Sequence, residues 1–171
     1  FDLTKKAPSD LGFPFVIKST SGKKGREVYS PKDKTDIKDI YAQLLPEEKA
    51  GKSFFAQEFV NCTKRIRVLV VGNRIIGSIS QLTKWRKRVS GYTPHEDEVK
   101  IEKFEPNSQL SGLALSAVAA VGIDIAGVDI LIDDVTGNYF VIEVNAAPSW
   151  KLIKKYCGIN VEYEILKYIS K

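Results

Sequence analysis

Three oxygen-bearing side chains stand in two apolar segments of the C-terminal half. Asp129 interrupts the run Gly-Val-Asp-Ile-Leu-Ile, and Glu143 and Asn145 end the run Phe-Val-Ile-Glu-Val-Asn. A carboxylate inside an apolar strand is costly to bury unless it is paired or binds a cation. Glu143 and Asn145 are two residues apart, so their side chains leave a strand on the same face. Two carboxylates and an amide oxygen are hard donors that suit magnesium completed by phosphate oxygens and water.

This metal site depends on how the two segments pair. If they form strands joined by a turn at residues 134–138, Asp129 comes to the same place as the other two side chains. The alternative is that Asp129 and Glu143 face solvent on a one-sided sheet. A calcium loop of the EF-hand type is excluded, because its pattern is absent from the sequence.

A basic, glycine-rich segment lies near the other end of the chain. Lys18 ends the apolar run Phe-Pro-Phe-Val-Ile-Lys, and the loop Ser-Thr-Ser-Gly-Lys-Lys-Gly follows it. Glycines let backbone amides approach an anion, and consecutive amides can form a concavity for phosphate. The loop is not a Walker A motif, because the Gly-Lys-Ser/Thr ending is missing, and a surface hairpin without a ligand is the alternative.

Two further groups of basic residues follow. Arg65 and Arg67 alternate within an apolar strand and therefore share one face, where an arginine can clamp a carboxylate or phosphate. A solvated face is the alternative for Arg65. The segment Lys-Trp-Arg-Lys-Arg at residues 84–88 combines four cations with an aromatic ring, which also suits nucleic-acid binding. That alternative leaves the acidic residues of the C-terminal half without a role.

Hydrophobic periodicity predicts the elements that must position these residues. We expect strands at residues 13–18, 26–29, 53–60, 65–71, 74–81, 128–132 and 139–144. We expect helices at residues 30–46, 107–121, 150–156 and 161–169. The first helix should begin at Ser30-Pro31 and stop near Pro46, and Gly72-Asn73 should turn a hairpin. The pattern predicts an α/β (α+β) fold, with a small lobe at residues 1–59 preceding a larger sheet with helices at residues 60–171.

Composition limits the class of protein. The 171 residues carry a net charge of +5, with 43% hydrophobic and 27% charged residues, which is typical of a globular protein. No apolar run approaches the roughly 20 residues that span a bilayer. Cys62 and Cys157 fit neither a disulfide framework nor a zinc spacing, and His95 has no nucleophile motif beside it. We therefore expect a cytoplasmic protein without a catalytic triad. Because the chain begins at Phe1 and has no methionine, we expect it to be a piece of a longer protein.

Taken in order, these segments resemble the ATP-grasp superfamily, in particular the glutamate-ligase-like branch typified by the RimK-like ribosomal-protein ligase. The matching stretches are residues 13–18, the loop to Gly25, then residues 27–28, 56–60, 66–72, 126–131 and 141–148. Each stretch is weak alone, but their order over nearly the whole chain is specific.

The resemblance implies an ATP-grasp fold with ATP bound between two lobes, a small lid subdomain (1–59) and a C-terminal subdomain (60–171). It implies that the nucleotide is contacted by Lys18, Ser21, Gly22, Gly25, Gln57, Glu58, Phe59 and Val60. It implies magnesium, or alternatively manganese, on Asp129, Glu143 and Asn145. Arg67 would be the catalytic donor that stabilises an acyl phosphate and the tetrahedral intermediate. Arg88 and Ser90 would face the substrate.

The activity that the resemblance implies is a carboxylate–amine ligase, which joins an amino acid such as glutamate to a small acid, a peptide or a protein tail. Nothing implies a membrane partner, and a homo-oligomer is compatible with the sequence. The sequence departs from the family pattern at Arg65, where the family usually has an acid, and at residues 84–91. Family members also carry an N-terminal domain and a second ATP-contacting lysine upstream of Phe1. A degenerate ATP-grasp scaffold and a nucleic-acid-binding module are therefore the alternatives.

Overall fold

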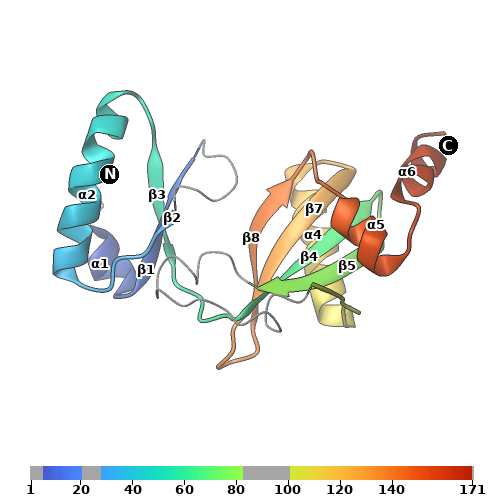
Figure 1. The fold of residues 1–171 in the computed structure, drawn as a ribbon, viewed down its shortest axis with the longest axis horizontal. Helices are drawn as coiled ribbons and strands as arrows, with labels where there is room; N and C mark the ends of the chain where they lie inside the picture. The colour runs from blue at the N-terminus through green and yellow to red at the C-terminus, as the bar shows by residue number, and fades with distance from the viewer. Residues whose placement is uncertain (1–5, 21–27, 83–100, 171) are drawn as a thin grey trace. The chain divides into compact units, whose positions relative to one another are not determined.

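The computed structural model describes residues 6–20, 28–82 and 101–170, which form two compact units (Figure 1). Within the described residues, the first unit ends at Phe59 and the second begins at Val60. Each unit has a sheet and a hydrophobic core of its own. No helix among the described residues is long and apolar enough to cross a membrane.

The first unit is a three-stranded antiparallel sheet with two helices on one face. The strand order is β2-β1-β3, and the elements are α1 (Lys6–Leu11), β1 (Phe15–Ser19), β2 (Val28–Tyr29), α2 (Lys34–Lys49) and β3 (Phe54–Glu58). Phe15 and Ile17 point toward the helices and are buried with Ile37 and Leu44 of α2. Because side chains alternate along a strand, Lys18 lies on the opposite face of this sheet.

Helix α2 differs from the prediction at both ends. It begins after Asp33, not at Ser30-Pro31, because the Asp33 carboxylate accepts hydrogen bonds from the backbone N–H groups of Thr35 (2.7 Å) and Asp36 (2.9 Å). Pro46 lies inside the helix, which continues to Lys49. The missing N–H of Pro46 therefore costs one bond near the end of α2 without stopping the helix. The short helix α1 was not predicted from the sequence.

The second unit is a five-stranded antiparallel sheet in the order β6-β5-β4-β7-β8. Its strands are β4 (Lys64–Val71), β5 (Arg74–Leu82), β6 (Glu102–Lys103), β7 (Ile125–Ile132) and β8 (Tyr139–Asn145). Its helices are α4 (Ser108–Val121), α5 (Lys151–Cys157) and α6 (Val161–Ile169). The predicted hairpin at Gly72 is confirmed, while β6 was not predicted.

Helix α4 covers one face of this sheet (Figure 1). The predicted helix is confirmed: the Asn107 side chain accepts a hydrogen bond from the Leu110 N–H at its start, and Gly122 ends it with a φ of 71°. Buried residues of α4 pack on alternate residues of β4 and β7, among them Val68, Val128 and Ile130. This face is the main core of the unit.

The other face of the sheet is divided. At one end, Leu69 and Ile79 pack against Ile153 of α5 and Val161 of α6. The remainder carries the polar side chains of Arg65, Arg67 and Asp129, which alternate with the core residues along β4 and β7. The fold therefore presents an ionic region on strands whose opposite face is apolar.

Candidate functional site

Pairing of β4, β7 and β8 brings three predicted site residues into one row. Arg67 lies directly opposite Asp129, and Asp129 lies directly opposite Glu143. Asn145 is in the next row, opposite Gly127. Residues opposite one another in an antiparallel sheet share a face, so all four polar side chains leave the face away from α4. The expectation that the two acidic segments pair across a turn is confirmed.

A β-bulge decides which face receives Glu143. From the turn onward, Ile132 pairs with Tyr139 and Ile130 with Val141, but Asp129 then pairs with Glu143, which leaves Ile142 as an extra residue. In an uninterrupted register Asp129 would face Ile142, and Glu143 would point to the apolar α4 side. The bulge therefore creates the carboxylate pair.

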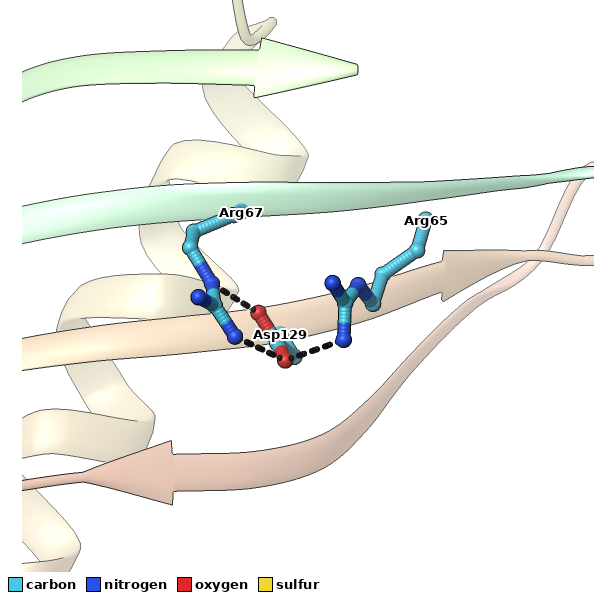
Figure 2. Close-up of polar contacts among 3 residues, drawn as sticks. All are labelled: Arg65, Arg67 and Asp129. Carbon is cyan, nitrogen blue, oxygen red and sulfur yellow. Dashed lines mark hydrogen bonds and ion pairs between the residues drawn. The ribbon is translucent and has the colours of Figure 1, made fainter. Parts of the chain in front are cut away.

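Asp129 is the centre of a three-residue ionic cluster (Figure 2). Its carboxylate accepts two hydrogen bonds from Arg67, from Nε and Nη2, both at 2.7 Å, and one from Nη1 of Arg65 at 2.9 Å. Asp129 is 0% exposed, and the side chains of Arg65 and Arg67 are only 19% and 22% exposed. The alternative of a solvated face is therefore wrong for Arg65 and Asp129, whereas Glu143 is exposed, as that alternative expected.

The two arginines differ electrostatically. The hydrogen bonds with Asp129 raise the pKa of Arg67 despite its burial. For Arg65, burial dominates and lowers the pKa, and the nearby charge of Arg67 lowers it further, while Asp129 and Glu143 oppose this in part. Hydrogen bonds to Asp129 thus stabilise the charged form of Arg67, whereas nearby acids offset the desolvation of Arg65 only in part.

The donor set fits the magnesium that the sequence predicts. Asp129, Glu143 and Asn145 present carboxylate and amide oxygens from one face of the sheet, and Glu143 is exposed. A carboxylate has about four lone-pair positions, so Asp129 retains acceptor capacity beyond its three hydrogen bonds. Within the described residues no three His, Cys, Asp or Glu side chains gather as a metal cluster, and the third predicted ligand, Asn145, is an amide.

The loop after β8 is held against the same face. A Cβ added to Gly127 would lie 2.9 Å from Cβ of Pro148, closer than such atoms approach in proteins. Gly127 therefore allows Pro148 to pack on the sheet, one row from Asp129. This packing fixes the segment that follows Asn145.

In the first unit, two of the residues predicted to contact ATP are in contact with each other. The Lys18 ammonium donates a hydrogen bond of 2.7 Å to Oε1 of Gln57, across the strands β1 and β3. Both side chains leave the face away from α2. The hydrogen bond holds the lysine ammonium on the face of the first unit's sheet that lies away from α2.

The other predicted residues are placed only in part. Glu58 is exposed, Phe59 is half-buried, and Val60 is buried at the first position of the second unit. The boundary between the units thus falls between Phe59 and Val60, two of the residues predicted to contact the nucleotide. The remaining predicted residues lie outside the described part of the chain: Ser21, Gly22, Gly25, Arg88 and Ser90.

The structure adds two residues to the site that sequence reasoning did not assign. Arg65 joins Arg67 on Asp129, and Gln81 lies opposite Arg65 in the pairing of β4 and β5. The signal for Arg65 was available, because a carboxylate in an apolar strand requires a partner and Arg65 shares the face of Arg67. Gln81 had no such signal, since its burial depends on the neighbouring strand.

The fold is that of the ATP-grasp ligases. The solved structure of the ATP-grasp ligase PsnB with a precursor variant, Mg and ADP matches at a TM-score of 0.67 and 19% identity, over 95% of this chain and 47% of that chain. The family profile described as the RimK-like ATP-grasp domain matches residues 3–169. The chain therefore belongs to the RimK-like ATP-grasp family.

Relatives in the family are synthases and ligases whose names refer to glutamate or to a glutamate-containing compound. N-acetylaspartylglutamate synthase A of Homo sapiens is 31% identical over 160 residues, which cover 92% of this chain and 39% of that protein. The probable alpha-L-glutamate ligase of Pasteurella multocida is 26% identical over 171 residues, 97% of this chain and 52% of that protein. The chain thus spans about half or less of the length of these relatives.

Proposed function

We propose that this chain is the ATP-binding part of a carboxylate–amine ligase whose amine substrate is an amino acid such as glutamate. A carboxylate oxygen attacks the γ-phosphorus of ATP, and ADP leaves. The amine nitrogen of the second substrate then attacks the acyl carbon of the acyl phosphate, loses a proton, and expels phosphate to leave an amide. The substrate whose carboxylate is phosphorylated is a small acid or the end of a peptide or protein. The enzyme works in the cytoplasm.

The observation that carries this proposal is the row Arg67–Asp129–Glu143 on one face of a RimK-like ATP-grasp domain. Arg67 is held by two bonds to a buried acid, and its remaining N–H groups can stabilise negative charge on the reacting acyl group. Lys18 binds a phosphate of the nucleotide, and backbone groups around Glu58 and Val60 read the adenine edge.

Asp129, Glu143 and Asn145 would hold magnesium, which neutralises phosphate charge during phosphoryl transfer. Glu143 is the exposed member of the set, so its carboxylate is accessible to a cation. Asp129 orients Arg67 at the same time, so one carboxylate links the metal site to the catalytic guanidinium.

The test of this proposal is nucleotide binding by the full-length protein. Magnesium with ATP at a concentration of 100 times Kd should raise the Tm by about 5–10 °C. The variant Glu143→Gln should lose most of this shift, because it removes a charged metal ligand but keeps the size of the side chain. Glu105→Gln, an exposed carboxylate of the same unit, is the matched control and should keep the shift. A full-length protein without any nucleotide-dependent shift would contradict the proposal.

A scaffold that binds partners without chemistry is the second candidate. It is favoured by one observation: both oxygens of Asp129 already accept hydrogen bonds from guanidinium groups. Phosphate release measured with ATP and a panel of amino acids and acids separates the two candidates. A working ligase releases phosphate only when both substrates are present, whereas a scaffold releases none.

A further inference from the structure

Two buried N–H donors near the ionic cluster lack an acceptor. Nε of Arg65 and Nε2 of Gln81 are shielded from solvent, and neither donates a hydrogen bond to any residue that the structure describes. Gln81 is 7% exposed, so its amide is almost completely removed from water. Buried polar groups in proteins nearly always have partners, because an unmade hydrogen bond costs free energy.

The two donors belong to neighbouring side chains on one face. Arg65 and Gln81 lie directly opposite each other in the antiparallel pairing of β4 and β5. Side chains at such positions leave the same face with Cβ atoms about 4.5–5.5 Å apart. This is also the face of Arg67 and Asp129, so the unpaired donors border the proposed reaction site.

The charge balance favours an anion as the missing acceptor. Arg65 gives one hydrogen bond to Asp129, while Arg67 takes both oxygens of that carboxylate. The Arg65 side chain is only 19% exposed, and the acid to which it donates is already bound twice by Arg67. A negative group beside Arg65 would give this buried cation a second charged partner, and the two oxygens of a carboxylate can accept from both donors.

We infer that Arg65 and Gln81 form a subsite that binds a non-reacting carboxylate of an acidic amino-acid substrate. Nε of Arg65 and the amide of Gln81 each donate to this carboxylate, which positions the substrate beside Arg67. The inference rests on the proposed ligase function and deepens it, because it identifies the residues that select an acidic substrate over a neutral one. The phosphate of a nucleotide is the other source of an anion, and the experiment separates the two.

The test measures binding of L-glutamate and, separately, of inorganic phosphate to the full-length protein by calorimetry, without nucleotide. Gln81→Leu should weaken L-glutamate about 10- to 100-fold, as expected for the loss of a hydrogen bond to a charged group. It should leave phosphate binding unchanged. Ser80→Ala is the matched control, since Ser80 is buried on the same strand but on the α4 side. It should leave both unchanged.

A second variant keeps the test informative if Gln81→Leu misfolds. Arg65→Lys keeps the positive charge beside Asp129 but removes Nε, and it should weaken L-glutamate in the same way. The Tm of the ligand-free Gln81→Leu protein should not fall, because the change removes a buried donor without a partner. Equal weakening of phosphate would assign the subsite to the nucleotide and overturn the inference. Unchanged glutamate affinity in both variants, or a wild-type protein that binds neither L-glutamate nor L-aspartate, would also overturn it.

Turnover separates this inference from the proposed function. In the active protein, Gln81→Leu should raise KM for glutamate and leave KM for ATP unchanged. If the protein forms no ADP with any pair of substrates, the ligase proposal fails, whereas the nucleotide-free binding comparison still reports on the carboxylate subsite.

Discussion

The two faces of the five-stranded sheet are built from the same strands but are stabilised by different interactions. On the α4 side, Val128 and Ile130 are fully buried among apolar neighbours. On the other side, Asp129 is equally buried, but its neighbours are two guanidinium groups. The apolar face depends on packing volume, whereas the ionic face depends on charge pairing that fails when one partner is removed.

The largest effect should come from breaking the ionic face at its centre. Asp129→Ala leaves two buried guanidinium groups without their acid and should lower the free energy of unfolding by about 3–5 kcal/mol. Urea denaturation of the folded chain measures this loss. If Asp129→Ala lowers the free energy of unfolding by less than Ile130→Val on the apolar face does, the arginine side chains turn toward water when their acid is removed.

The close approach of the loop after β8 should give the next effect. In Gly127→Ala, the added Cβ would meet Pro148 at 2.9 Å, so the loop must move away from the row next to Asp129. Overpacking of this kind costs about 1–3 kcal/mol. Magnesium-dependent ATP binding should weaken together with the Tm, because Asn145 lies opposite Gly127. Gly112→Ala is the matched control, since an added Cβ there meets nothing within 4 Å.

The apolar face should respond less and in a different way. Ile130→Val removes one methylene group from a fully buried side chain beside Asp129 in sequence, and should cost about 0.5–1.5 kcal/mol. Nucleotide affinity, measured by calorimetry, should not change, because Ile130 points to α4. A loss of affinity comparable to that of Glu143→Gln would mean that the two faces are coupled.

The smallest change in stability should come from Arg65. Arg65→Met removes a buried cation whose pKa is already lowered by burial, and leaves Asp129 paired to Arg67 through two bonds. We expect a cost of about 0–1 kcal/mol, because an apolar side chain of similar length avoids the desolvation of the guanidinium. Arg67→Met should destabilise clearly more in the same urea titration. Equal costs would contradict the difference between the two arginines.

Much of this arrangement was predictable from local patterns. The alternation of Arg65 and Arg67 placed them on one face, and Gly72 and Gly122 marked a hairpin and a helix end. These features depend on residues within a few positions of one another. The predicted start of α2 at Ser30-Pro31 was wrong, because the carboxylate of Asp33, three residues later, accepts the hydrogen bonds from the N–H groups of the first turn.

The sequence by itself determined which side chains share a face, because the two-residue period of a strand is a local property of the backbone. Only the tertiary structure decided that β4 lies between β5 and β7, which brings Arg67 onto Asp129, 62 positions away. It also decided that a bulge at Ile142 turns Glu143 onto the face of Asp129. Strand order and register arise from packing between distant segments, and no local pattern contains that information.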